Sequence, residues 1–211
     1  RLHGQKEKKT LFCLSKCRED DVKPQQTDFL VIGSGLAGLA FALKSCDLGR
    51  VTIVTKDIAS SANTSWAQGG IAAVMSEEDS FEAHIQDTLR AGAGLCKEDI
   101  VRDYVEQAPD RIRDLLNWGV QFNISGESGA MHLTREGGHS FRRVLHFEDH
   151  TGVEIHRALL AECRKQPNIE IMEDHFVIDL ILNKQVDPSD VSPSSCLGAY
   201  VLDKKSGEVK V

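Results

Sequence analysis

The sequence predicts an α/β fold of the Rossmann type, built on a parallel sheet, and three features lead to this prediction. The apolar segment 29–32 has the length and composition of a buried strand. The segment 33–38 follows it with the GxGxxG spacing, and a helix is expected to begin at about Leu36. A second apolar segment at 51–54 then predicts the next parallel strand, which completes a βαβ unit.

The three glycines of this turn each have a physical use at a pyrophosphate. Gly33 permits a sharp turn, Gly35 lets the backbone approach a ligand, and Gly38 lets the helix pack closely on the strand. The pyrophosphate would lie at the helix N-terminus, where unpaired N–H groups and the helix dipole favour an anion. The alternative is a glycine turn that only joins two packed elements. The flanking strands and helix favour a nucleotide cofactor.

Composition and net charge exclude several kinds of partner for this chain. The chain has 211 residues, of which 41% are hydrophobic and 27% are charged, so one domain or slightly more is expected. The net charge is −7 and no long basic run occurs outside the N-terminal tail, so no nucleic-acid partner is predicted. No apolar stretch reaches the roughly 18 residues that span a bilayer, so a soluble protein without a membrane partner is predicted.

The six cysteines are scattered along the chain, which is typical of a reducing compartment. Cys13 and Cys17 form the one close pair. As half of a metal site this pair lacks a second pair, so two free thiols in a flexible tail are expected.

Residues 1–27 are predicted to be a flexible N-terminal tail, because they are polar and show no periodicity. The chain starts without methionine, so we expect a processed product or a piece of a longer protein. The segment 56–73 is rich in hydroxyl groups and glycine, and it is expected to lie along a bound cofactor. Its alternative is a surface connection.

Hydrophobic periodicity and turn residues predict the other helices and strands. In the helices, Tyr104 and Trp118 are expected in the core or at its boundary, and Val153 is available for burial. Helices are predicted from a cap at Asp79 or Ser80 to Gly92 or Gly94, over 100–108 up to Pro109, from Pro109 to Gly119, and from a capping box at 151–154 to about Lys165. Strands are predicted at 169–172, 176–182, 197–202 and 208–211, with the last two forming a hairpin.

The segment 131–151 is the most polar part of the chain and has neither helical nor strand period. His146 and His150 are four residues apart, but the expected helix begins just after them, so no metal site is predicted.

The same segment offers an anion site. Arg135, Arg142 and Arg143 lie close to a Gly-Gly pair, and guanidinium groups suit a carboxylate. Glu136 has a use if the ligand also carries an ammonium group. The alternative is an Arg–Glu surface network around a glycine turn, and the composition leaves both interpretations open.

Five separated motifs, in the same order, closely resemble the L-aspartate oxidase family of the succinate dehydrogenase and fumarate reductase flavoprotein superfamily. They are found at 33–38, 64–73, 87–93, 133–140 and 143–146, within a match over about 28–182. The resemblance implies a Rossmann-like FAD-binding domain of the GR2 type, with a parallel sheet and an added β-hairpin or meander. Residues 28–211 would be its incomplete N-terminal part, without the capping and C-terminal helical domains.

The resemblance implies FAD as the dinucleotide. Lys56 follows the second strand where an acidic residue is more usual, but this branch of flavoproteins commonly has lysine there. Membrane succinate dehydrogenases attach the flavin to a histidine at the position of Asn63, so FAD is expected to be bound non-covalently. The expected FAD-binding residues are Gly33, Ser34, Gly35, Leu36, Ala37, Gly38, Lys56, Asn63, Thr64, Ser65, Gln68, Gly69 and Gly70.

The resemblance also implies the substrate site. Glu136, with a desolvated carboxylate near the substrate ammonium group, and His139 are the expected substrate-binding residues. The implied reaction is hydride transfer from Cα of L-aspartate to flavin N5, which gives iminoaspartate, with oxygen or fumarate as acceptor. Quinolinate synthase would use the product, in the first step of de novo NAD biosynthesis.

Two alternatives remain at this point: a soluble fumarate reductase or succinate dehydrogenase flavoprotein, and a non-catalytic module that binds FAD or NAD(P). The family's other substrate-binding arginines and histidines and its general acid or base would lie beyond Val211, so these 211 residues alone are expected to be inactive. The resemblance fits a bacterial cytoplasm or, in a photosynthetic eukaryote, a plastid.

Overall fold

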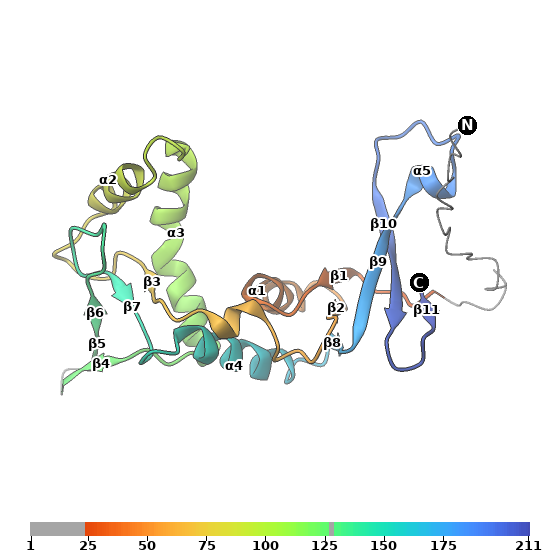
Figure 1. Cartoon of the computed structure of the whole chain (residues 1–211), viewed down its shortest axis with the longest axis horizontal. Coiled ribbons are helices and arrows are strands. Elements are labelled where there is room, and N and C mark those ends of the chain that lie inside the picture. The colour runs from red at the N-terminus through yellow and green to blue at the C-terminus, as the bar shows by residue number, and fades with distance from the viewer. Residues whose placement is uncertain (1–23, 127–128) are drawn as a thin grey trace, which may run out of the picture.

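The computed structural model describes residues 24–126 and 129–211, and it has an elongated shape (Figure 1). Helices α2 (Phe81–Ala91) and α3 (Glu98–Asn117) lie at one end. A parallel sheet with two helices lies in the middle, and an antiparallel ribbon of strands lies at the other end. Most of the expected tail, including Cys13 and Cys17, lies outside the described residues.

The central sheet is the predicted βαβ unit with one more parallel strand. Its strands are β1 (Phe29–Ile32), β2 (Val51–Val54) and β8 (Ile169–Met172), in the order β1-β2-β8. Helix α1 (Leu36–Ser45) connects β1 to β2, and α4 (Thr151–Cys163) leads into β8 and packs on α1. Strand β2 lies in the middle of the sheet and all four of its residues are buried, as its continuous apolar run predicts, whereas β1 lies at the edge and its last residue, Ile32, is 56% exposed.

The main core lies between this sheet and its two helices. Leu39 of α1, Ile53 of β2 and Leu159 of α4 are each 0% exposed. Leu43, Cys46 and Cys163 are also buried, as the periodicity predicts.

The predicted hairpin is a three-stranded meander in the structure. Strands β9 (His175–Leu182), β10 (Cys196–Asp203) and β11 (Val209–Lys210) pair antiparallel in the order β11-β10-β9. Ala199 and Val201 pack with Val54 of the central sheet. The one-turn helix α5 (Asn183–Val186), between β9 and β10, is absent from the sequence prediction.

The prediction that a helix stops at Pro109 is wrong, because α3 continues through this residue. An interior proline removes one hydrogen bond and costs about 3 kcal/mol in an isolated helix. Here Val105 and Ile112 are buried on either side of it, and Pro109 is itself buried. We infer that burial on both sides outweighs the local cost. Gly119 follows the helix with φ +85°, as expected for a C′ residue.

Three smaller expectations about burial and capping differ from the structure. Tyr104 is 73% exposed and Val153 is 48% exposed, so neither is a core residue, whereas Trp118 packs at the core boundary as predicted. The capping box is wrong as well. His150 is the N-cap of α4, and Glu154 is used elsewhere: its carboxylate accepts a hydrogen bond from the backbone N–H of Gln121 and pairs with Arg157.

The other expected features of this region are present. Ser80 caps α2, where its Oγ accepts a hydrogen bond from the Ala83 N–H. The loop after β2 contains the 3₁₀ helix η1 (Asn63–Trp66) and strand β3 (Ile71–Ala72). The polar segment and the residues just before it form two-residue strands, which are β4 (Ile124–Ser125), β5 (Ala130–Met131), β6 (Leu133–Thr134) and β7 (Val144–Leu145).

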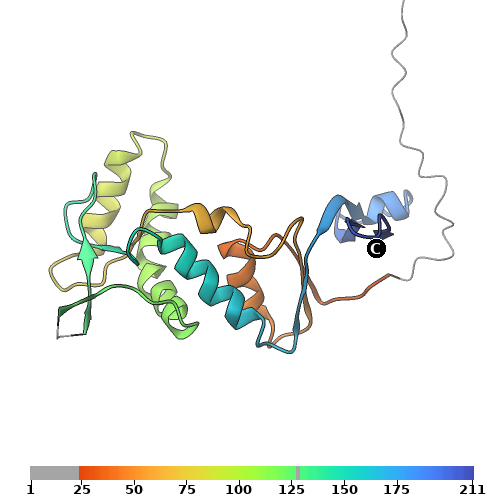
Figure 2. The same ribbon diagram turned by 60° about the horizontal axis from the view of Figure 1, so that its bottom comes forward.

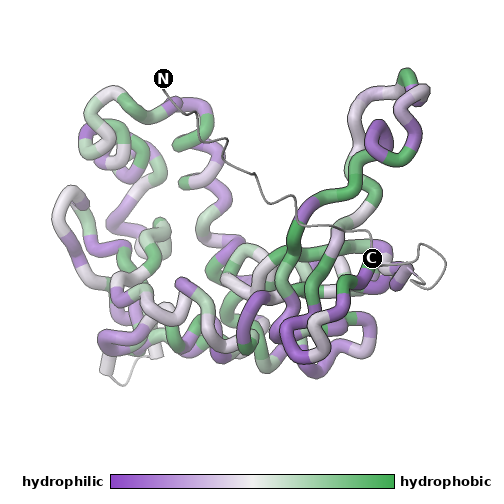
Figure 3. The backbone as a smooth tube through the Cα atoms, turned by 45° about the vertical axis from the view of Figure 1, so that its right-hand side comes forward, coloured by the Kyte–Doolittle hydropathy of each residue, from purple (hydrophilic) through white to green (hydrophobic). Residues whose placement is uncertain are grey.

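Within the described residues, no helix combines the length and hydrophobicity needed to span a bilayer. Hydrophobic and hydrophilic stretches alternate along the backbone, as Figure 3 shows.

Burial predicts where truncation is costly. Leu159→Ala removes a side chain that is 0% exposed and should lower the free energy of unfolding by about 2–5 kcal/mol, measured by denaturant unfolding. Leu48→Ala is the matched control, because Leu48 is 77% exposed and should change stability by less than about 0.5 kcal/mol. Equal losses for the two variants would contradict the described core.

Candidate cofactor and substrate site

The glycine turn has the geometry that its sequence predicts. Gly33 has φ +100°, a conformation that other residues rarely adopt. A Cβ on Gly38 would overlap the carbonyl oxygen of Gly33, so only glycine allows α1 to lie this close to β1. Among the described residues, the N–H groups of Ala37 and Gly38 at the start of α1 have no partner, as expected for a helix N-terminus. The turn therefore presents free donors to an anion.

Ser34 supports this turn from inside the protein. Its side chain is buried, and its Oγ donates to the carbonyl oxygen of Ala59 at 2.9 Å and lies 3.3 Å from Oγ1 of Thr55. Any contact of Ser34 with a ligand must therefore come from its backbone.

His156 is a functional candidate that the sequence analysis missed. This buried residue of α4 places Nε2 2.8 Å from the carbonyl oxygen of Ser34, so a helix 122 positions away fixes the turn. Its spacing within the predicted helix gave no sign of this contact, because the partner is a backbone atom that is distant in sequence.

The segment around η1 packs against α4, as Figure 2 shows, and it is joined to α1 by one hydrogen bond. Oγ1 of Thr64 accepts a hydrogen bond of 3.0 Å from the N–H of Leu36, the first residue of α1. On the other side, the N–H of Gly152 donates to the carbonyl oxygen of Ala67 at 3.0 Å, and a Cβ on Gly152 would overlap the Thr64 carbonyl. The expected residues of η1 are thus brought to the glycine turn.

The remaining expected FAD residues lie along the same loop. Asn63, Gln68 and Gly69 are exposed. Ser65 uses its Oγ to donate to the Ser60 carbonyl at 3.2 Å. Gly70 packs against the backbone of Leu145 so closely that a Cβ would overlap it.

Lys56 follows β2, so it lies at the same carboxyl edge of the sheet as the glycine turn. Its side chain is exposed, and its carbonyl oxygen accepts a hydrogen bond of 2.7 Å from Lys204 Nζ. Ligands of open α/β sheets bind at this edge.

The expected substrate residues form a second group, in the turn between β6 and β7. His139 is half-buried. Glu136 is exposed, so the desolvation expected for its carboxylate is not found among the described residues. Strand β7 pairs antiparallel with β3, which directly follows Gly70. The β6–β7 turn is therefore joined to the loop 56–70, called the cofactor loop below, through one pair of strands.

Neither of the two interpretations left open for the three arginines, an anion site or a surface network, describes Arg143. This side chain is 0% exposed and forms a bidentate pair with Asp79, with both N–O distances 2.7 Å. Its Nη1 also donates to Asp87 at 2.8 Å. A guanidinium engaged in this way cannot also bind a ligand carboxylate. Arg135 and Arg142 are exposed.

Asp87 is the hub of this buried group. It accepts hydrogen bonds of 2.7 Å from both the backbone N–H and the Oγ of Ser140. Burial acts to raise the pKa of Asp87, but the hydrogen bonds from Ser140 and Arg143 outweigh it and lower the pKa to about 2. The pKa of His84 is lowered by burial and by the charge of Arg143. At neutral pH Asp87 is therefore ionised beside the Arg143 guanidinium, and His84 is neutral.

His146 pairs with His132 rather than with His150, with 2.8 Å between Nε2 and Nδ1. Among the described residues, no cluster of three or more histidine, cysteine or acidic side chains is placed to hold a metal ion.

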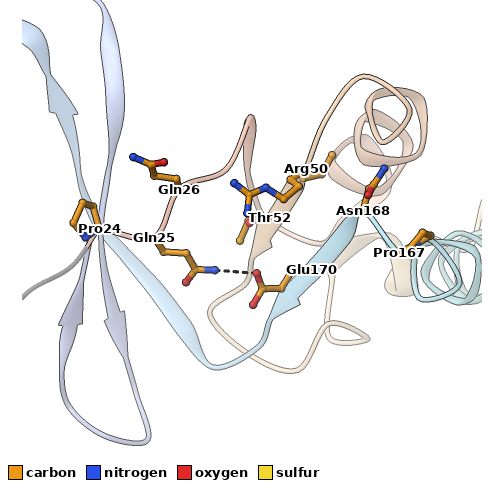
Figure 4. A pocket seen from close by; sticks show the side chains of 9 residues that line it. Pro24, Gln25, Gln26, Arg50, Thr52, Pro167, Asn168 and Glu170 are labelled. Carbon is orange, nitrogen blue, oxygen red and sulfur yellow. Dashed lines mark hydrogen bonds between the residues drawn. The ribbon is translucent and has the colours of Figure 1, made fainter.

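A polar cavity of about 460 Å³ lies at the opposite edge of the central sheet (Figure 4). Arg50 and Asn168, which precede β2 and β8, line it together with Glu170, whose carboxylate accepts a hydrogen bond from Gln25. It is formed at the amino ends of the strands, so it is separate from the glycine turn.

Comparison with known proteins gives L-aspartate oxidases as relatives. The enzyme of Pseudomonas aeruginosa is 46% identical over an alignment of 190 residues, which covers 87% of this chain and 35% of that protein. The chloroplastic L-aspartate oxidase of Arabidopsis thaliana is 46% identical over 182 residues, which are 86% of this chain and 27% of that protein. The chain spans about a quarter to a third of the length of these relatives.

Solved structures with the same fold are succinate dehydrogenase and fumarate reductase flavoproteins. Sdh1 of Mycobacterium smegmatis superposes with a TM-score of 0.80 at 27% identity, over 90% of this chain and 32% of that chain. Quinol fumarate reductase FrdA of E. coli gives a TM-score of 0.77 at 27% identity, over 86% of this chain and 30% of that chain. The predicted fold class is thereby confirmed.

The FAD binding domain family matches residues 28–211, which include the glycine turn, the η1 loop and the polar segment. The free donors at the start of α1 fit the pyrophosphate of such a cofactor. The prediction of FAD is confirmed, and the chain belongs to the FAD binding domain family.

Proposed function

We propose that this chain is the N-terminal part of an L-aspartate oxidase, which oxidises L-aspartate to iminoaspartate with FAD. The observation that carries the proposal is the 46% identity to two L-aspartate oxidases, against 27% to Sdh1 and FrdA. The capping and C-terminal helical domains would lie in the remaining length of the protein, together with other substrate-binding residues.

In this proposal the glycine turn and the η1 loop hold FAD. The N–H groups of Ala37 and Gly38 donate to the pyrophosphate, and Lys56 lies near the adenosine ribose. Ser65, Gln68 and Gly69 lie along the ribityl chain and the flavin. Asn63 has no imidazole to bond the flavin, so the cofactor is non-covalent. His156 holds the turn in place through the Ser34 carbonyl.

The turn between β6 and β7 receives the substrate. FAD, when bound, supplies the acceptor for the hydride from Cα. Glu136 pairs with the substrate ammonium, a group that succinate and fumarate lack, and His139 contacts a substrate carboxylate. Glu136 is exposed here, so its desolvation would come from the substrate and the rest of the protein.

The product and the acceptor belong to the same proposal. Oxygen or fumarate accepts the electrons, and quinolinate synthase consumes iminoaspartate in NAD biosynthesis. Relatives include bacterial enzymes and enzymes named chloroplastic, so the proposed compartment is the cytoplasm or a plastid.

A second candidate is a soluble fumarate reductase or succinate dehydrogenase flavoprotein, which the TM-score of 0.80 to Sdh1 favours. An absorbance spectrum of the full-length protein separates the two. Anaerobic L-aspartate should bleach the flavin bands of an aspartate oxidase, whereas bleaching by succinate alone would support the alternative.

Gly38→Ala tests the proposed cofactor seat in the full-length protein. The added methyl group overlaps the Gly33 carbonyl, and relieving such an overlap costs about 1–3 kcal/mol, so the ratio of FAD to protein after purification should fall. Gly198→Ala is the control, since no heavy atom lies within 4 Å of its added Cβ. Full FAD occupancy in Gly38→Ala would contradict the proposed seat.

Glu136→Gln tests the choice of substrate. Loss of a hydrogen bond between charged groups costs about 1.5–3 kcal/mol, so kcat/KM for L-aspartate should fall by about 10- to 100-fold. Reduction of fumarate should change much less, because fumarate has no ammonium group. Equal losses for both substrates would remove the reason for assigning Glu136 to the ammonium.

A further inference from the structure

We propose that Arg143 is a positioning residue that fixes His139 as a neutral hydrogen-bond donor, through Nε2, to a substrate carboxylate. This inference rests on the proposed function only in placing a dicarboxylate at the β6–β7 turn. It assigns a role to a buried arginine that the proposed function leaves unused.

The first step is that two ion pairs hold the guanidinium group of Arg143 in one position. Asp79 binds Nε and Nη2 as a fork, and Asp87 binds Nη1. The two carboxylate side chains are 1% and 2% exposed, so water does not compete for these bonds. Buried charges of this kind are stable only when paired, and this network pairs the guanidinium on two sides.

The second step concerns the protonation of His139. The Nη1 atom of Arg143 lies 3.3 Å from Nδ1 of His139. A guanidinium only donates hydrogen bonds, so Nδ1 must be the acceptor. A neutral imidazole that accepts at Nδ1 carries its hydrogen on Nε2. The contact therefore selects one tautomer, and protonation of Nδ1 would place two N–H groups against each other.

The third step is that the ring cannot easily turn away. Ser140, the next residue, is held twice by Asp87. The ring of His84 lies on another side, with 5.7 Å between the ring centroids. The neighbouring Gly138 lies close to Ala91 at the end of α2. His139 is half-buried, so part of its ring remains accessible to a ligand.

The chemical consequence is a division of roles. A neutral Nε2–H donates to a carboxylate, but it has no lone pair at Nε2 with which to accept a proton from the substrate. His139 therefore binds and orients the substrate and does not act as a general base. No bond is made or broken at this residue.

A comparison of His139→Gln with His139→Leu in the full-length flavoprotein tests this role. Glutamine can accept from Arg143 through Oε1 and donate through Nε2, so it reproduces the proposed tautomer, whereas leucine does neither. We expect kcat/KM for L-aspartate to stay within about 10-fold in His139→Gln and to fall about 10- to 100-fold in His139→Leu, mainly through KM. Equal impairment of both variants would overturn the proposal.

A double-mutant cycle tests the part played by Arg143. Arg143→Lys keeps the charge but loses the fork, and it should raise KM. Combined with His139→Leu it should add little, because the histidine through which it acts is gone. Additive effects would overturn the proposal. Arg102→Lys is the matched control, since Arg102 also pairs with acidic side chains but is 41% exposed.

A substitute variant and a binding measurement separate failure of this proposal from misfolding and from failure of the proposed function. If Arg143→Lys does not fold, Ser140→Ala takes its place in the cycle, since it removes one hydrogen bond to Asp87 and leaves the ion pairs intact. Succinate binding, followed through the flavin spectrum, is measured for all variants and should follow the same order. If L-aspartate is not oxidised but succinate binding follows this order, the proposed function fails and the role of Arg143 stands.

Discussion

The close approach of α1 to β1 is the constraint on which the candidate cofactor site depends. It exists because position 38 has no Cβ, so the Gly33 carbonyl lies where a side chain would otherwise begin. The first N–H groups of α1 lie beside this contact, at the carboxyl edge of the sheet where β1 ends. Other elements then hold the turn in place: His156 of α4 binds the Ser34 carbonyl, and Thr64 binds the first N–H of the helix.

The glycine turn and the β6–β7 turn, which form the two ends of the candidate site, differ in how charged groups are arranged. The glycine turn has no acidic residue in the first helical turn, which leaves the dipole free for an anion. The β6–β7 turn instead depends on a buried arginine between two carboxylates. Such a network adds little net stability, because desolvation offsets the Coulomb gain. It does fix geometry, and here it holds a turn between two strands of only two residues each.

The sequence was sufficient for features that depend on local chemistry. The apolar runs and the glycine spacing predicted β1 and β2 with their observed bounds, and the residue at which α1 begins. Features that depend on partners distant in the sequence could not be predicted from it. The sequence shows Arg143 beside other arginines, but Asp79 precedes it by 64 positions, so its pairing is invisible. Glu154 fits a capping box locally, yet Gln121 and Arg157 bind its carboxylate instead.

The pairing of β3 with β7 links the two ends of the site into one unit. Ile71 pairs with Leu145 and Ala72 with Val144, and the next residue, Ala73, donates to the carbonyl of Arg143. The cofactor loop therefore ends on the same short ladder that carries the positioning arginine. A shift in this ladder would move Gly70 and Arg143 together, because Gly70 packs directly on the Leu145 backbone. In the proposed function, main-chain contacts would thus set the distance between the η1 loop and the β6–β7 turn, and the side chains of Glu136 and His139 would be left for the substrate.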